Sequence, residues 1–335
     1  MSVTKLRAVA VITVVVAVVG IAPGAHAAER RDGVLVYSWF NREESDLEPA
    51  PLLDESAIRA IAPRGGEPLT LRGCTKAAGK ADVGDCSISY RDPAISPNGR
   101  RVAFDAGATL ALMRIDGSGF RLLPAHSDGD GDPAFSPDGT QLAFSAGAST
   151  AIFDLRPDRG VWISDLAGAG ARRVTARGIS PAWSPRGWIA FLRADGVYRV
   201  RPDGRGLRRL VARSRCTDVA WSPHGTQLVF ACRSRLYVSR GDGRHVRLVP
   251  PRLISATAVA WAPSGGRLAV VPFDGGVVTI RPDGTHQRVV VDGAYSSMGA
   301  FGAGAVAWQP RRKSGLCRRS CTTRAADPRR AGEGA

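Results

Sequence analysis

Three aspartates stand at the same place in a repeated stretch of the chain, and their spacing is the first indication of a site. Each lies five residues before the proline of a Pro-x-Gly motif: Asp92, Asp132 and Asp218. If the fold brings them to one mouth, three carboxylates on an otherwise basic protein would create a focused negative potential. Such a potential could hold a divalent cation, calcium among them, or the basic or N-terminal end of a peptide partner. The alternative is a local role, because an Asp before a strand often accepts backbone hydrogen bonds in a turn.

The acidic stretch 127–133, with the sequence SDGDGDP, resembles the start of a calcium-binding loop. An EF-hand loop requires a Glu at its twelfth position. Counted from Asp128, that position is Gly139, so the EF-hand pattern is excluded. A calcium site of another kind and a plain polar loop between two strands remain as alternatives.

Catalytic signatures are not found in the chain. No GxSxG nucleophile elbow occurs. None of the five His residues has Asp or Ser neighbours in an arrangement that indicates a proton relay. We therefore expect no catalytic residue and no cofactor.

The six cysteines fall into three local pairs. Those pairs are Cys74 with Cys86, Cys216 with Cys232, and Cys317 with Cys321. An even number of cysteines in an exported chain favours disulfides. A zinc site is the alternative, but no CxxC motif occurs and the histidines are distant in sequence. Disulfides are the better interpretation.

The first 27 residues have the pattern of a secretory signal peptide. Lys5 and Arg7 precede an uncharged run at 8–22, and Ala25-His26-Ala27 fits a cleavage site before Ala28. The run is shorter than the roughly 20 residues that span a bilayer, although an uncleaved N-terminal anchor remains the alternative. No later segment could span a bilayer, so we expect no transmembrane segment in the mature chain. The predicted location is secreted, periplasmic or cell-envelope.

A repeated motif indicates the elements that must position the three aspartates. Copies such as PAFSPDGTQLAF, from Pro133, recur with motif prolines 38–48 residues apart, at Pro97, Pro137, Pro185, Pro223, Pro263 and Pro310. Each unit contains a strand, a Pro-x-Gly turn, an apolar second strand, a third strand, in most units an Asp-Gly turn, and a short basic fourth strand. Four antiparallel strands in a unit of this length are typical of a propeller blade.

The two ends of the array complete each other. The stretch 33–40 has the pattern of a second strand with no first strand before it, and 57–63 and 68–71 supply the third and fourth. The stretch 305–310 is a first strand with nothing after it. We therefore predict an all-β, six-bladed β-propeller with four-stranded antiparallel blades over residues 28–310, closed by pairing of its N- and C-terminal strands. Residues 311–335 are predicted to be a flexible basic tail.

The residues that carry this pattern resemble a known family. PAFSPDGTQLAF, followed by a strand and a DGxxxRLL segment, is similar to the TolB-like, or WD-repeat-like, propellers of exported bacterial proteins. The resemblance covers roughly residues 33–310 and is specific for the repeat. It implies a propeller of the bacterial envelope. TolB itself carries a separate N-terminal domain, whereas here the first strand pattern begins soon after the cleavage site.

Charge and composition limit the classes of function that the sequence allows. The formal net charge is +16, yet the arginines are scattered over turns and polar strand faces, and no aromatic-plus-basic motif for stacking bases occurs. We expect no nucleic-acid partner. We predict a monomeric, noncatalytic scaffold that binds a protein or a cell-envelope polymer. The alternative is an enzyme with its site in the central channel, such as a lactonase or a polysaccharide lyase. Fold alone does not decide between them, but the inner strands supply mainly Ala, Trp, Ser and Pro with a few Asp.

Overall fold

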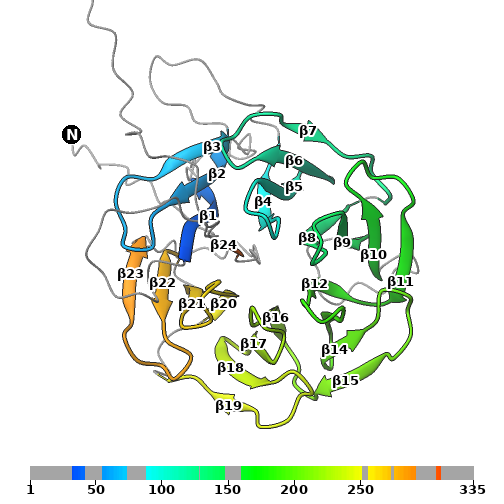
Figure 1. Ribbon diagram of the computed structural model, residues 1–335, viewed down its shortest axis with the longest axis vertical. Helices are drawn as coiled ribbons and strands as arrows, with labels where there is room; N and C mark the ends of the chain where they lie inside the picture. Colours follow the sequence, from blue (N-terminus) through cyan, green and yellow to red (C-terminus); the bar gives the residue numbers. More distant parts are fainter. Residues whose placement is uncertain are drawn as a thin grey trace, which may run out of the picture.

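Six four-stranded antiparallel sheets make up the part of the chain that the structure describes. The structure is a computed structural model, and it describes residues 32–41, 55–73, 88–127, 129–147, 160–250, 256–272, 275–291 and 307–310. The sheets stand as blades around a central axis (Figure 1). Within these ranges we find no helix with the length and apolar character needed to cross a bilayer. The predicted fold class, an all-β six-bladed propeller, is confirmed.

Five blades are continuous in sequence, and each runs outward from its first strand to its fourth. Blade 1 comprises β4 (Tyr90–Ile95), β5 (Arg101–Ala106), β6 (Thr109–Arg114) and β7 (Arg121–Leu122). Blade 2 comprises β8 (Gly131–Phe135), β9 (Gln141–Ala146), β10 (Gly160–Asp165) and β11 (Arg172–Ala176). Blade 3 comprises β12 (Ile179–Trp183), β13 (Ile189–Arg193), β14 (Gly196–Val200) and β15 (Arg208–Val211). Blade 4 comprises β16 (Cys216–Trp221), β17 (Gln227–Cys232), β18 (Arg235–Arg240) and β19 (Arg247–Leu248). Blade 5 comprises β20 (Ala256–Trp261), β21 (Leu268–Pro272), β22 (Val277–Ile280) and β23 (Arg288–Val291).

The sixth blade is assembled from both ends of the array. It comprises β24 (Ala307–Pro310), β1 (Asp32–Asn41), β2 (Glu55–Ile61) and β3 (Leu69–Gly73). Strand β24 pairs antiparallel with β1, with Leu35 opposite Trp308 and Val36 opposite Ala307. It also contacts β20 and β4, the inner strands on either side (Figure 1). The predicted closure of the ring by its terminal strands is confirmed.

The Ser-Pro-x-Gly motif recurs because its serine holds the first turn of a blade. In blade 2 the Ser136 hydroxyl accepts the Gln141 N–H at 2.9 Å, and the Gly139 N–H donates to the Ser136 carbonyl at 2.9 Å. Gly139 has φ +71°, a value that glycine adopts without the Cβ penalty. The equivalent serines also accept a backbone N–H: Ser96, Ser184 and Ser222. The motif is therefore explained by folding and says nothing about a ligand.

The core lies between successive blades rather than within each one. The aromatic residues of the second strands are fully buried: Phe104, Phe144, Phe191 and Phe230. Phe144 of β9, for example, packs in one cluster with Leu112 of β6 and Phe135 of β8. Each blade thus covers the apolar face of its neighbour, as expected for a repeat that cannot bury its core alone.

The two ends of the ring differ in the kind of chain segment they present. In an antiparallel blade the turn between strands 1 and 2 and the turn between strands 3 and 4 lie at one end, which we call the turn face. The start of strand 1 and the turn between strands 2 and 3 lie at the other, which we call the mouth face. Successive blades keep this orientation, since the Arg186 Nε in a first turn donates to the His224 carbonyl in the next blade's first turn at 3.0 Å.

Arginines of the outer strands join neighbouring blades in a regular way. The Arg172 Nη1 donates to the Pro202 carbonyl at 2.8 Å, and the Arg247 Nη1 donates to the Pro282 carbonyl at 2.9 Å. Arg288 bonds the Arg64 carbonyl at 2.8 Å, and Arg121 bonds the Leu166 carbonyl. In each case the acceptor lies in the turn between strands 3 and 4 of the following blade. These four arginines are spread over the polar outer strands, as expected, but they share one role that appears only when the blades are placed side by side.

Several predicted features lie outside the described residues. They are the signal peptide at 1–27, the basic tail at 311–335, and the cysteines Cys74, Cys86, Cys317 and Cys321.

Candidate functional site

The three predicted aspartates lie on innermost strands at the mouth face. Asp92 is on β4, Asp132 on β8 and Asp218 on β16 (Figure 1). At each of them the pairing between the first and second strands shifts register. Asp92 and Asp132 adopt φ +45° and +51°, in the left-handed region that Asp tolerates better than most residues. Such irregularities re-aim side chains, and here they occur at an acidic residue near the start of the inner strand in three blades.

A fourth carboxylate, Asp105 on β5, joins this set. Burial raises the pKa of Asp105 well above its usual range, and the charges of Asp92 and Asp132, with a hydrogen bond to Asp92, raise it further. Arg91 opposes the shift. Sequence reasoning missed Asp105, although a single acidic residue in the apolar run VAFDA was a signal that could have identified it.

Asp218 belongs to the same electrostatic group. Burial raises the pKa of Asp218 well above its usual range, two backbone hydrogen bonds oppose this, and the charges of Asp132 and Asp92 add to it. Asp92 and Asp132 thus lie near enough to act on the ionisation of Asp218.

These carboxylates bind the backbone of the next blade. The Asp132 N–H donates to Asp105 Oδ1 at 3.0 Å, and the Ser180 N–H donates to Asp132 Oδ2 at 3.1 Å. The Val259 N–H donates to Asp218 Oδ2 at 2.8 Å. Asp218 Oδ1 also accepts the Val219 N–H of its own strand at 2.7 Å, so these carboxylates bind backbone both locally, as the alternative expects, and across the blade boundary.

Metal binding at these groups would compete with hydrogen bonds already present. Among the described residues, no three or more His, Cys, Asp or Glu side chains are grouped so that they could hold a metal ion. Asp132 Oδ2 accepts both the Ser145 hydroxyl at 2.8 Å and the Ser180 N–H. A cation bound there would have to displace these donors. In the acidic stretch 127–133, Asp128 lies outside the described residues.

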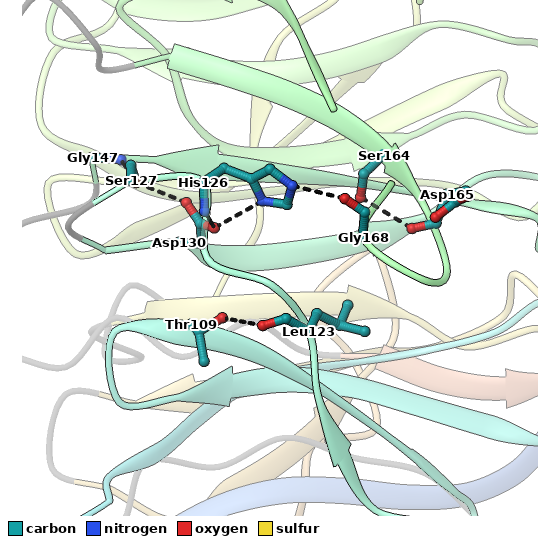
Figure 2. A network of polar contacts seen from close by, with 9 residues as sticks. All are labelled: Thr109, Leu123, His126, Ser127, Asp130, Gly147, Ser164, Asp165 and Gly168. Carbon is teal, nitrogen blue, oxygen red and sulfur yellow. Dashed lines mark hydrogen bonds and ion pairs between the residues drawn. The ribbon is translucent and has the colours of Figure 1, made fainter. Parts of the chain in front are cut away.

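His126 forms a network that sequence reasoning did not anticipate (Figure 2). Its Nδ1 lies 3.1 Å from Asp130 Oδ2, and its Nε2 lies 2.9 Å from the Gly168 carbonyl. Both partners are acceptors, so both contacts are hydrogen bonds only when both ring nitrogens carry a proton. Asp130 follows His126 by four residues, a contact that the search for a proton relay did not single out.

The network nevertheless has a structural geometry. The Ser127 hydroxyl donates to Asp130 Oδ1 at 2.7 Å and accepts the Gly147 N–H at 2.7 Å, so it does not bond the His126 ring (Figure 2). A relay needs the base to face the nucleophile. Instead the network fastens the connection between β7 and β8 to the turn between β10 and β11.

Cys216 and Cys232 form a disulfide between β16 and β17. The two residues are directly opposite each other in the strand pairing. This confirms the pairing predicted from their spacing around the turn at Pro223. The bond lies beside Asp218 and ties the first two strands of blade 4 at the mouth face.

Replacing both cysteines, Cys216→Ala and Cys232→Ala, should lower the free energy of unfolding by about 3 kcal/mol. The bond joins residues 16 apart, and closing a loop of this size removes about that much unfolded-state entropy in the chain-entropy model. Urea unfolding without reductant measures the difference. The double variant keeps four cysteines, so adding reductant to it isolates their contribution. Equal urea midpoints for the variant and the unreduced parent would show that the disulfide does not stabilise the folded protein.

Comparison with known proteins identifies the fold. No protein-family model matches the chain, and no curated protein matches it in sequence. A chain of the nidogen/laminin complex superposes with a TM-score of 0.60 at 9% identity, covering 76% of this chain and 95% of that one. A putative TolB from Agrobacterium tumefaciens gives 0.57 at 17% identity, covering 69% and 87%. TolB from Acinetobacter baumannii gives 0.54 at 15% identity, covering 76% and 63%. The likeness to TolB propellers is thus confirmed for the fold.

Proposed function

We propose that the chain is an exported, noncatalytic propeller scaffold that binds a protein or cell-envelope partner at its mouth face. The observation that carries this proposal is the gathering of Asp92, Asp132 and Asp218 on inner strands of a protein with net charge +16. Ionised carboxylates in a low-dielectric ring focus a negative potential along its axis. Burial raises the pKa of Asp218 well above its usual range, so we assign the negative charge to Asp92 and Asp132. A positively charged segment of a partner, such as a peptide N-terminus or a basic side chain, fits that potential.

The bonding of the polar groups supports a scaffold. Asp105, Asp132 and Asp218 accept backbone N–H groups of the next blade. His126 is held between Asp130 and a carbonyl. Groups held in this way stabilise the ring and set its charge, whereas a catalytic base must be free to take a proton from a substrate.

The disulfide supports export. Disulfides persist in the periplasm and outside the cell, and they are rare in the reducing cytoplasm. The bond between Cys216 and Cys232 therefore agrees with the signal-peptide pattern of the first residues.

Site-specific photocrosslinking in envelope extracts tests the proposal. A photoreactive residue is placed at Ala194, which is exposed in the turn between β13 and β14 at the mouth face, or at Leu207, which is exposed at the turn face. We expect one defined partner adduct from position 194 and none of that mass from position 207. Equal labelling at both faces would contradict a mouth-face site.

The charge of the mouth is tested by Asp132→Asn. The amide oxygen can still accept from Ser145 and Ser180, so the ring should stay closed while one negative charge is lost. We expect capture of the partner to weaken on the order of tenfold, the size of one charge-assisted contact. Glu67→Gln is the matched control, since Glu67 is an exposed acid at the turn face. If both variants captured the partner equally well, the mouth-face carboxylates would not contribute to partner binding.

A further inference from the structure

Positive charge on the turn face is greatest in blade 3 and continues onto the neighbouring blade 4. Their turns and adjoining strand ends carry eight arginines against two aspartates, Asp203 and Asp242: Arg186, Arg199, Arg201, Arg205, Arg208, Arg240, Arg244 and Arg247. The corresponding segments of blade 2 carry Asp138, Asp165 and a single arginine, Arg172. The same segments carry four arginines against Asp116 in blade 1 and three against Asp283 in blade 5. Blade 3, with five arginines against Asp203, is therefore the most basic of these blades, and with the adjacent blade 4 it forms one basic sector of this face.

An aromatic platform lies at the centre of this sector. Trp188, half-buried in the first turn of blade 3, has the guanidinium carbons of Arg199 and Arg201 each 4.1 Å from its ring centroid. Stacking on an indole fixes the plane of a guanidinium group and leaves its N–H edge for an anion. Among the described residues, the buried Arg199 Nε finds no hydrogen-bond partner. Its Nη1 reaches the Gly241 carbonyl of blade 4 only at 3.5 Å.

The arginines of the sector repel one another. Burial lowers the pKa of Arg199, and the nearby charges of Arg208 and Arg201 lower it further, while Asp242 partly compensates. The two aspartates relieve little of this repulsion. Asp203 and Asp242 are each 3.9 Å from an exposed arginine, Arg205 and Arg244, and exposed pairs of this kind contribute little. A bound anion would neutralise charge that the protein itself leaves uncompensated.

We propose that the turn face of blades 3 and 4 binds a linear anionic polymer, with Arg199, Arg201 and Arg208 as the central contacts. The chemistry recognised is a row of closely spaced oxyanions, since guanidinium groups bind phosphate and carboxylate oxygens in a bidentate manner. A polymer fits better than a single small anion, because Arg240 and Arg244 continue the positive charge from blade 3 onto blade 4. The site is at the opposite end of the ring from Asp132, so it is independent of the proposed mouth-face function.

Binding of inorganic polyphosphate across a range of salt concentrations tests this site. The test variant is Arg201→Gln with Arg208→Gln, which replaces two exposed side chains, one of them stacked on Trp188. The matched control is Arg177→Gln with Arg235→Gln, two exposed arginines of the mouth face, which changes the net charge equally. We expect the test pair to weaken binding at least tenfold near physiological salt. The slope of log affinity against log salt should fall by about two, roughly one for each lost phosphate contact. The control pair should leave the slope unchanged.

Each outcome of the polyphosphate experiment either supports the proposed site or contradicts it. Loss confined to the test pair, with thermal unfolding unchanged, supports the site, whereas equal loss in both pairs would show general charge attraction and overturn it. Polyglutamate of matched charge distinguishes carboxylate from phosphate polymers, and binding of either one through the test pair supports the proposal. Tighter binding of duplex DNA than of both polymers, with the same sensitivity, would instead make this face a nucleic-acid surface. Asp132→Asn should leave polyphosphate binding unchanged, which keeps this site separate from the mouth.

Discussion

Deleting residues 304–335 should lower the free energy of unfolding by about 5 kcal/mol or more. The deletion removes β24, which pairs with β1 and contacts the inner strands β4 and β20. Leu35 and Val36 of β1 are completely buried, and exposing the equivalent of two such side chains costs about 5 kcal/mol. The unpaired edge of β1 would also favour association. Urea unfolding and light scattering measure both effects.

Deleting only residues 313–335 provides the control. This shorter deletion keeps β24, which ends at Pro310, and it removes most of the basic tail. We expect a change below about 0.5 kcal/mol, as for substitutions away from packed features. If the two truncated chains unfold at the same urea concentration, pairing of the chain ends does not stabilise the ring.

Asp218→Ala should destabilise the protein by about 4 kcal/mol. Asp218 Oδ1 accepts the Val219 N–H at 2.7 Å, and its Oδ2 accepts the Val259 N–H of the next blade at 2.8 Å. Both hydrogen bonds are buried, and a buried donor without an acceptor costs about 1–3 kcal/mol. Chemical unfolding measures the loss. A change below about 1 kcal/mol would mean that water or another group replaces the carboxylate.

Asp105→Asn also removes a buried carboxylate, but we expect this variant to be more stable than the parent at pH 8, whereas Asp218→Ala should be less stable. The amide oxygen can accept the Asp132 N–H that Asp105 Oδ1 now accepts at 3.0 Å, and the NH₂ group can donate to Asp92. Because the pKa of Asp105 is raised well above its usual range, the folded state keeps a proton that the unfolded chain releases above about pH 4. The contribution of Asp105 to stability is therefore fully present below about pH 4 and is lost as the pH rises toward the raised pKa.

The asparagine variant should lack this decline. Each pH unit of the window is worth about 1.4 kcal/mol, so Asp105→Asn should be more stable than the parent at pH 8 and nearly equal to it at pH 4. Thermal unfolding across pH measures the difference. Parallel stability curves for variant and parent would show that Asp105 is ionised in both the folded and unfolded states over this range.

Features that depend on neighbours in sequence were predictable. The Ser-Pro-x-Gly turn, the four strands of a blade and the pairing of Cys216 with Cys232 all follow from residues within one repeat. A two-strand hairpin has its register set by its turn, so the cysteines on either side of Pro223 come opposite each other. Ring closure was predictable for a related reason, because each end of the array had an incomplete blade and an unpaired strand edge is unfavourable.

Partners across a blade boundary were decided by the tertiary structure. Asp132 and Ser180 are 48 residues apart, Asp218 and Val259 are 41 apart, and Arg288 and Arg64 are 224 apart. Nothing in one repeat specifies which group of the next will lie within hydrogen-bond distance.

The sequence by itself determined a six-bladed ring, its local turns and the inner-strand position of the three aspartates, because these depend on short-range patterns repeated along the chain. The tertiary structure decided what those groups do. It made the aspartates acceptors for neighbouring blades, brought Asp105 to them, and gathered arginines around Trp188 on one sector of the turn face. The physical reason is that hydrogen bonding, burial and charge repulsion depend on distances in space, which the blade-to-blade packing sets.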